Sequence, residues 1–234
     1  MKQYIVLIFS LWTVAVFGQD NPELRINDSK LKSYIPEGWL TVADARGDLN
    51  GDGQEDVAIV IADTNENNYL PNTALGPTTL NTNPRSLLIL FNEKGTYRLV
   101  AKNESLIEPA NNVEVPCLDD PFIETNFVIK NGVIIINHNY FYTCGTFGVT
   151  NKTYKIKYIN KAFVLIGYDV EEFSRATGDD EITSINFITR KKSITTGSNE
   201  FYPEKNKPKT TWFTIKIKKL LTLEDIDRDT EINY

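Results

Sequence analysis

Residues 47–57 carry the side chains of this chain that are best suited to holding a metal ion. They read Gly-Asp-Leu-Asn-Gly-Asp-Gly-Gln-Glu-Asp-Val, with side-chain oxygens at every second position and one further carboxylate. Calcium is a hard cation that takes about six to eight oxygen ligands in flexible geometry. We therefore predict a calcium loop whose ligands are Asp48, Asn50, Asp52, the backbone carbonyl of Gln54, and Asp56.

Two glycines in this loop support the metal interpretation. Gly51 and Gly53 tolerate the backbone angles of a sharp turn, and three carboxylates so close together would repel one another without a cation. The alternative is a polar β-turn without metal, because Asn-Gly and Asp-Gly are common turn signals. An EF-hand is excluded, because its twelfth loop position requires a glutamate and this chain has Ile59 there.

The segments on either side of the loop predict β-strands. Residues 57–62 are an apolar, largely β-branched run typical of a buried strand, and residues 39–43 also read as extended. With Ala43-Asp44 before the loop and Asp56-Val57 after it, the chain resembles the FG-GAP or VCBS calcium-loop repeat. The resemblance implies a calcium hairpin in a propeller-like blade, as in the N-terminal region of integrin α chains. A complete propeller would show several such loops, and this sequence shows one clear copy.

The first 18 residues have the form of a signal peptide. A positive Lys2 precedes an apolar stretch from Ile5 to Phe17, which is short for a membrane helix. Val16 and Gly18 occupy the −3 and −1 positions of the expected cleavage site before Gln19. We expect export to the periplasm, the cell surface or the medium, with no membrane span after cleavage. The net charge of −6 argues against a nucleic-acid partner, for which a basic face is expected.

Cys117 and Cys144 are the two cysteines of the chain. In an exported protein an even number of cysteines favours a disulfide. Buried free thiols or a redox pair are the alternatives, although neither cysteine lies in a Cys-x-x-Cys motif. We predict a structural disulfide that ties the loop at 116–121 to the loop at 141–147.

The remaining pattern predicts an all-β fold of adjacent antiparallel hairpins. Strand signals group into three sets, 39–102, 122–170 and 182–219, and Asn131-Gly132 is a strong hairpin turn. We expect propeller-like blades, too few to close a regular propeller, or alternatively a sandwich of two sheets. The expected division is a leading segment at 19–38, one all-β domain at 39–220 and a solvated acidic C-terminal tail at 221–234. Long polar insertions at 63–84 and 197–209 are candidate functional loops.

Other side chains are also candidates for a functional site. His138 is the lone histidine, and Asp119-Asp120 and Asp179-Asp180 are carboxylate pairs, but neither feature stands in a recognisable catalytic context. Tyr140, Tyr142 and Phe147 cluster beside the expected disulfide. If exposed, they would form a platform for binding carbohydrate or protein, whereas if buried they belong to the core, which is the interpretation that we favour.

The mature chain also resembles a group of secreted proteins of Bacteroidetes-type bacteria. The residues that carry this resemblance are 35–39, 85–91, 154–158, 164–168 and 184–187. The resemblance supports one continuous domain and implies no activity. We expect a calcium-stabilised, non-enzymatic binding protein of the cell envelope that takes a glycan or a protein. The alternatives are an inhibitor or immunity-type protein against a wall-degrading enzyme, and a surface-polysaccharide hydrolase using His138 or Asp179 and Asp180.

Overall fold

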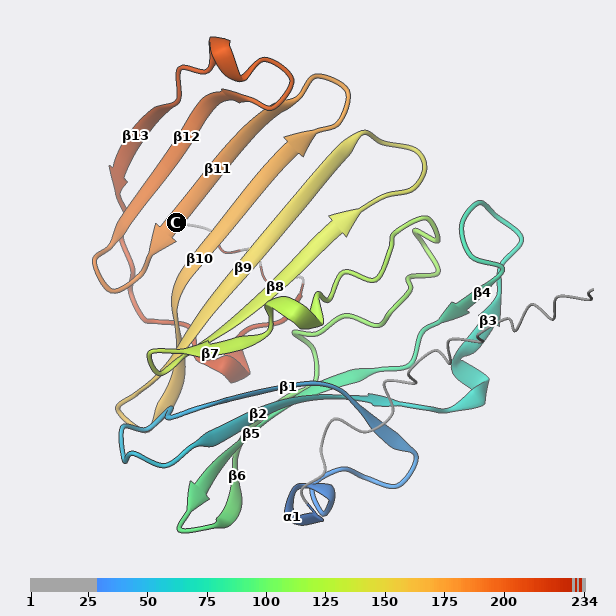
Figure 1. The fold of residues 1–234 in the computed structure, drawn as a ribbon, viewed down its shortest axis with the longest axis vertical. Coiled ribbons are helices and arrows are strands. Elements are labelled where there is room, and N and C mark those ends of the chain that lie inside the picture. The colour runs from blue at the N-terminus through green and yellow to red at the C-terminus, as the bar shows by residue number, and fades with distance from the viewer. Residues whose placement is uncertain (1–28, 229, 231, 233–234) are drawn as a thin grey trace, which may run out of the picture.

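A computed structural model describes residues 29–228, 230 and 232 (Figure 1). The expected signal peptide at 1–18 lies outside these residues, as does much of the leading segment. The described part begins with the short helix α1 (Ser29–Lys32) and continues almost entirely as strands and turns. No helix in it is long and apolar enough to cross a bilayer.

The first sheet has four antiparallel strands in the order β1-β2-β5-β6. These are β1 (Trp39–Gly47), β2 (Asp56–Asp63), β5 (Arg85–Glu93) and β6 (Thr96–Asn103). Between β2 and β5 the chain makes the 3-10 turn η1 (Glu66–Asn68) and the small hairpin of β3 (Tyr69–Pro71) and β4 (Thr79–Asn81). This hairpin lies within the polar insertion predicted at 63–84.

The second sheet has seven antiparallel strands, which follow one another in chain order from β7 at one edge to β13 at the other. Its strands are β7 (Val128–Lys130), β8 (Val133–Phe141), β9 (Gly148–Ile159), β10 (Ala162–Ser174), β11 (Asp179–Asn186), β12 (Lys191–Asn199) and β13 (Lys209–Thr214). Three further 3-10 turns lie around it: η2 (Glu124–Asn126), η3 (Pro203–Lys205) and η4 (Leu223–Asp225).

Tight turns join neighbouring strands and fix their pairing. The β7–β8 turn places Asn131 at φ 54° and Gly132 at φ 71°, and the β9–β10 turn places Asn160 at φ 50° and Lys161 at φ 67°. Positive φ at both central residues is the mark of a type I′ turn, whose twist matches that of paired strands. The sequence prediction of a hairpin turn at Asn131-Gly132 is confirmed.

One hydrophobic core lies between the two sheets. The four-stranded sheet contributes small side chains such as Ala43, Ala45, Ala58 and Ala101, which permit a close approach of the larger sheet. The seven-stranded sheet contributes bulkier residues: Ile134, Ile136, Tyr154, Ile156, Phe163, Leu165, Tyr168 and Ile185. On its other face the four-stranded sheet packs against Leu31 of α1 and against Tyr34, Ile35 and Trp39. Strand β2 is therefore buried on both faces, as its continuous apolar run predicted.

The all-β prediction is confirmed, while the predicted grouping of strands into three sets is wrong. The sets at 122–170 and 182–219 form a single sheet, because β10 and β11 pair along seven residues from Gly167 to Phe173. Figure 1 shows this large sheet crossing over the four-stranded sheet, with α1 on the far side of the latter. Two antiparallel sheets packed face to face fit a sandwich-like arrangement.

The predicted acidic tail at 221–234 is wrong for its first residues. Leu223 and Ile226 have exposed fractions of 0% and 1%, and both belong to the core. Their backbone carbonyls accept hydrogen bonds from the Asn103 amide at 2.6 and 2.8 Å. The acidic composition concealed these two apolar residues, which close the core between β6 and β10.

Candidate functional site

The predicted metal ligands lie in the β1–β2 hairpin loop, where several side-chain oxygens bond to the loop's own backbone. The Asp48 carboxylate accepts hydrogen bonds from the amides of Gly51 at 2.7 Å and Gly53 at 2.9 Å. These bonds lower the pKa of Asp48, with the Gly53 amide as the largest cause. Asp52 accepts from the Gln54 amide at 2.8 Å. The two glycines adopt φ of 81°, as the predicted sharp turn requires.

Asp56 differs from the other predicted ligands because its side chain is buried, with an exposed fraction of 0%. One carboxylate oxygen accepts from the Leu49 amide at 2.9 Å, and the other accepts from the Asn92 amide at 2.9 Å. Burial raises the pKa of Asp56, with Asp52 adding to the rise. Asp56 thus joins three segments: the loop, the start of β2 and the end of β5.

The donor set of this loop matches the chemistry of a calcium site in part. Asp48, Asn50 and Asp52 offer exposed oxygens on a preformed turn, and each bonded carboxylate oxygen of Asp56 keeps a lone pair. Within the described ranges, no three His, Cys, Asp or Glu side chains gather closely enough to form a metal-binding group. Calcium binding by Asp48, Asn50, Asp52, Gln54 and Asp56 therefore stays a prediction.

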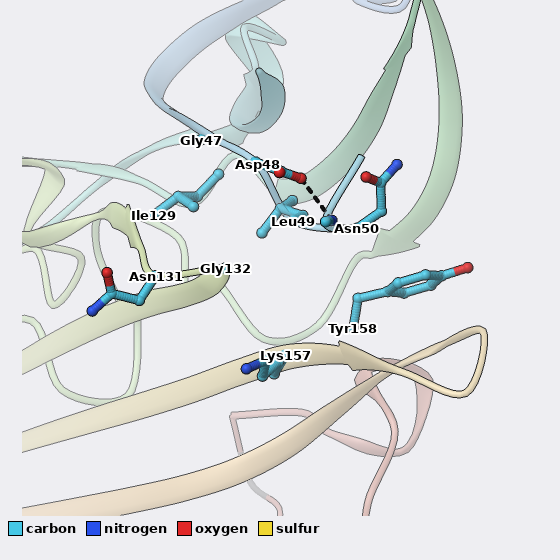
Figure 2. A pocket seen from close by; sticks show the side chains of 10 residues that line it. Gly47, Asp48, Leu49, Asn50, Ile129, Asn131, Gly132, Lys157 and Tyr158 are labelled. Atoms are coloured by element: carbon cyan, nitrogen blue, oxygen red, sulfur yellow. Dashed lines mark hydrogen bonds between the residues drawn. The ribbon is translucent and has the colours of Figure 1, made fainter. Parts of the chain in front are cut away.

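Beside this loop lies a pocket of about 550 Å³ at the junction of the two sheets (Figure 2). The loop contributes Asp48 and Asn50, the β7–β8 turn contributes Asn131 and Gly132, and β9 contributes Tyr158. The hairpin loop comes close to the other sheet beside this pocket: a Cβ atom on Gly47 would lie 2.6 Å from the Ile129 side chain, and one on Gly132 would lie 3.4 Å from the Asp48 carbonyl oxygen. This position suits an element that holds the two sheets together.

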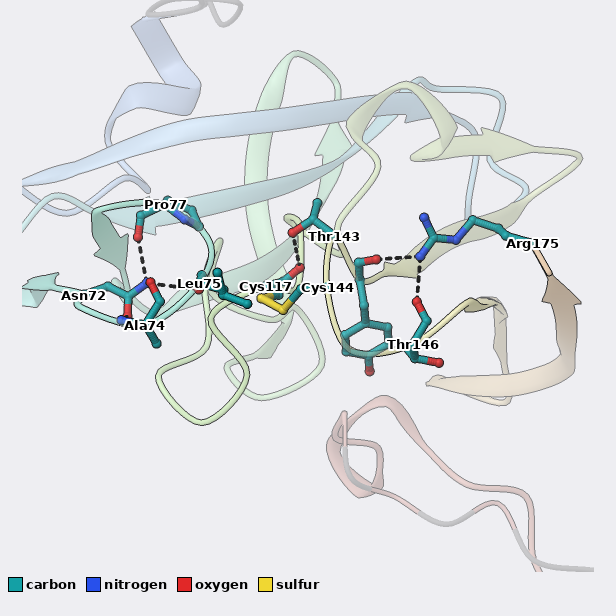
Figure 3. Close-up of a disulfide and its surroundings, with 10 residues drawn as sticks. Asn72, Ala74, Leu75, Pro77, Cys117, Thr143, Cys144, Thr146 and Arg175 are labelled. Atoms are coloured by element: carbon teal, nitrogen blue, oxygen red, sulfur yellow. Dashed lines mark hydrogen bonds between the residues drawn. A yellow bond between two sulfur atoms is a disulfide. The ribbon is translucent and has the colours of Figure 1, made fainter.

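The predicted disulfide between Cys117 and Cys144 is confirmed, with the two Cα atoms 5.6 Å apart. Thr143 reinforces the link by donating its amide, at 2.8 Å, and its hydroxyl, at 3.0 Å, to the Cys117 carbonyl. Figure 3 shows the β3–β4 loop beside this bridge. A Cβ atom on Gly76 would lie 2.4 Å from the Pro116 carbonyl oxygen, so glycine is needed for this close packing.

The three aromatic residues that are candidates for a binding platform do not form one continuous exposed surface. Tyr140 points toward the core side, where its hydroxyl donates to Glu108 at 2.6 Å, and burial strongly raises its pKa. The carbonyl of Tyr142 accepts a bond from Arg175 at 2.7 Å. Phe147, in the β8–β9 loop, is 66% exposed. Of the three residues, only Phe147 offers a largely free ring.

His138 is part of a buried polar cluster between the sheets. Its side chain has an exposed fraction of 0%, and its ring packs edge-on near Tyr140 and Tyr154. Nearby, Arg85 donates to Asp120 at 2.7 Å and to the Glu108 carbonyl at 3.2 Å. A histidine without solvent access cannot exchange protons with a substrate, so the structure gives no support to a hydrolase built on it.

The opposite face of the seven-stranded sheet carries a polar surface that the sequence reasoning missed. Strand register aligns one residue from each of six strands in a single cross-strand row: Asn137, Thr153, Asp169, Ser184, Ser193 and Trp212. The next row on the same face contains Asn139, Asn151, Glu171, Ile182, Thr195 and Thr210. Alternation of polar and apolar residues within each strand was the available signal, but the register was needed to join the rows.

Hydrogen bonds order the side chains of these two rows. Asn137 donates to Thr153 at 2.8 Å, and Asn139 donates to Asn151 at 2.6 Å. A further hydrogen bond reaches β10, because Asn151 of β9 donates to Glu171 of β10 at 3.0 Å. Asp169 accepts from the Ser184 hydroxyl at 2.6 Å and forms an ion pair with Lys155.

Part of this polar face is hollowed into a groove of about 490 Å³. Strands β8 to β11 form its floor, over about 14 Å if adjacent strands are separated by the usual 4.8 Å. Ile123 and Asn126, around the turn η2, line it from outside the strands. Amide, hydroxyl and carboxylate groups thus converge in one open depression of the surface.

Comparison with known protein families, with curated proteins and with solved structures found no match for this chain.

Proposed function

We propose that this protein is an exported, non-enzymatic binding protein whose polar groove takes an uncharged stretch of an envelope glycan. The observation that carries this proposal is the convergence of Asn137, Asn151, Asp169, Glu171 and Ser184 in one groove. Sugar hydroxyls are both donors and acceptors, and the groove offers both kinds of partner on adjacent strands.

The contacts within the groove favour binding over acid–base chemistry. Asp169 already accepts a bond from Ser184 and pairs with Lys155, while Glu171 accepts from Asn151. Each carboxylate therefore has a fixed orientation, which suits recognition of a hydroxyl. A rigid sheet also orders these groups before the ligand arrives, which reduces the entropy that binding costs.

Calcium has a supporting place in this proposal. An ion held by Asp48, Asn50 and Asp52, with Gln54 and Asp56, would offset the repulsion among the carboxylates. Because the loop packs against the β7–β8 turn, this would stabilise the junction of the two sheets. The ion would act on the stability of the domain, and the groove on the other face would contact the glycan.

The glycan proposal is tested by affinity electrophoresis with soluble peptidoglycan fragments, dextran, mannan, xylan and laminarin. We expect retardation by at least one of them. Substituting Asn151→Ala or Ser184→Ala should weaken that affinity roughly ten-fold, since one or two lost hydrogen bonds are worth about 1.4 kcal/mol. Equal affinity of these variants and the natural protein would contradict the role of the groove.

Thr195→Ala is the matched control. Thr195 lies on the same face and its hydroxyl bonds to that of Thr210 at 2.9 Å, but it does not line the groove. Its affinity should equal that of the natural protein. Absence of retardation by every glycan tested would overturn the proposal for these ligands.

The calcium proposal is tested by differential scanning calorimetry in calcium and in chelator. A free ion concentration about 100 times Kd stabilises the folded state by about 2.7 kcal/mol, which corresponds to roughly 5–10 °C in Tm for a chain of this size. Asp52→Ala should abolish the shift, whereas Glu55→Ala should keep it, because Glu55 is an exposed carboxylate outside the alternating ligand positions. An identical Tm with and without calcium would refute the site.

A further inference from the structure

Strand β13 is the outermost strand of the seven-stranded sheet at the end away from β7, and all six of its residues are exposed. Within the described residues it pairs with β12 alone. Edge strands present unpaired backbone donors and acceptors, and proteins usually protect them. A strand whose side chains are all largely exposed gains little hydrophobic stabilisation of its own, so β13 is unusual for the edge of a stable sheet.

Two large aromatic side chains lie on opposite faces of this edge. Trp212 is 66% exposed and belongs to the same face as Ser193, whereas Phe213 is 45% exposed and lies on the face of Lys192. Charged residues protect an edge against association, and β13 has one of them, Lys209, at its first position. Trp212 and Phe213 provide apolar surface on the two faces of this edge. A strand added beside β13 would therefore meet an aromatic ring on either face.

The charge around this edge is opposite to that of the whole protein. Residues 190–219 contain nine Lys or Arg and two Asp or Glu, a net charge of +7 in a chain of net charge −6. Lys209 shares the face of Phe213 and Lys192, so two lysines accompany one exposed ring. Among the described residues, the ion pairs of this segment are confined to Lys219, which contacts Asp225.

We infer that the edge of β13 binds an extended acidic segment of a partner protein as an eighth strand. Such a segment uses all three features: its backbone pairs with the free edge, its apolar side chains contact Trp212 and Phe213, and its carboxylates meet the lysines. A lipid surface or an anionic polysaccharide would leave the backbone groups unpaired. A second copy of β13 would bring like charges together. This inference is independent of the glycan groove.

The inference is tested by fluorescence anisotropy with a labelled ten-residue synthetic peptide that alternates valine and glutamate. We expect saturable binding that weakens with salt. The same peptide with N-methyl groups on alternate amides should lose at least ten-fold in affinity, because it cannot pair with a strand edge. A valine–lysine peptide should not bind.

Protein variants locate the site. Lys192→Glu with Lys209→Glu should reduce affinity for the valine–glutamate peptide at least ten-fold and create binding of the valine–lysine peptide. The matched control is Lys130→Glu with Lys157→Glu, which makes the same change in net charge away from β13 and should leave affinity unchanged. Trp212→Thr with Phe213→Thr should also weaken binding, and folding should survive, since neither side chain is buried.

Three results would overturn the inference. They are no saturable binding of the acidic peptide, undiminished binding of the N-methylated peptide, and equal loss of affinity in the two charge-reversed proteins. If anionic vesicles or dextran sulfate bind through Lys192 and Lys209 while the peptide does not, the partner is an anionic surface and the proposed strand addition is wrong.

Discussion

At the scale of single residues, the two most informative side chains are those of Asp56 and His138, which are both buried. Asp56 accepts two backbone amides, and His138 has both ring nitrogens buried without a hydrogen-bond partner among the described residues. Burial without compensation is costly for a polar group, and it is costlier for a charged one. Both residues therefore affect how folding responds to pH.

His138 should make stability depend on pH. Burial lowers its pKa to about 4, and the charges facing it are Lys152, Asp120 and Arg85. The folded state keeps the ring neutral, whereas the unfolded chain takes up a proton below about pH 6.5. The unfolding free energy should therefore fall as pH drops from about 6.5 toward 4, by about 3 kcal/mol in total. Urea unfolding at several pH values measures this fall, and His138→Leu should remove most of it above pH 5.

A direct measurement is also possible because the chain has one histidine. Its Cε1 proton gives a single NMR resonance in protein without a tag, and the midpoint of its titration should lie near pH 4. A midpoint near 6.5 in the folded protein would show that the ring is accessible and would rule out this source of pH dependence.

At the scale of elements, the disulfide anchors segments that contribute few buried side chains. The stretch from 111 to 116 is exposed or half-buried, and so are residues 143–148 of the β8–β9 loop. The bridge joins the two, and the β3–β4 loop packs onto it at Gly76. The disulfide therefore stabilises two segments that have few buried apolar side chains to hold them in place.

Removing the bridge should lower stability substantially. Its cysteines are 27 residues apart, and closing a loop of this length is worth about 3–4 kcal/mol on the chain-entropy argument. Cys117→Ala with Cys144→Ala should lower Tm by roughly 7–14 °C. Reductant should lower the Tm of the natural protein by a similar amount and leave the double variant unchanged. No change after reduction, with both thiols confirmed by mass spectrometry, would contradict this role.

At the scale of the whole molecule, packing divides the seven-stranded sheet into surfaces with different chemistry. One face meets the four-stranded sheet and is lined by residues such as Ile136, Tyr154 and Leu165. The other face carries the polar groove, and the edge at β13 carries positive charge and exposed aromatics. Because the larger sheet has more strands than its partner, its outer strands extend beyond the shared core (Figure 1).

The sequence by itself determined the features that depend on near neighbours. Strands follow from β-branched runs such as 57–62, turns from Asn131-Gly132, and the disulfide from the presence of two cysteines in a chain for which we predict export. The predicted calcium loop is a pattern of the same local kind and stays a prediction. Each of these inferences needs only residue types and short spacings.

Only the tertiary structure decided which distant residues meet. The pairing of β10 with β11 merged two expected blades into one sheet, and the resulting register brought Asn137, Asn151, Asp169 and Ser184 into one groove. The tertiary structure also placed the Asp56 carboxylate where it accepts hydrogen bonds from the Leu49 and Asn92 amides. Register and burial arise from contacts between segments far apart in the chain, and a one-residue shift would turn every polar side chain of a strand to the other face.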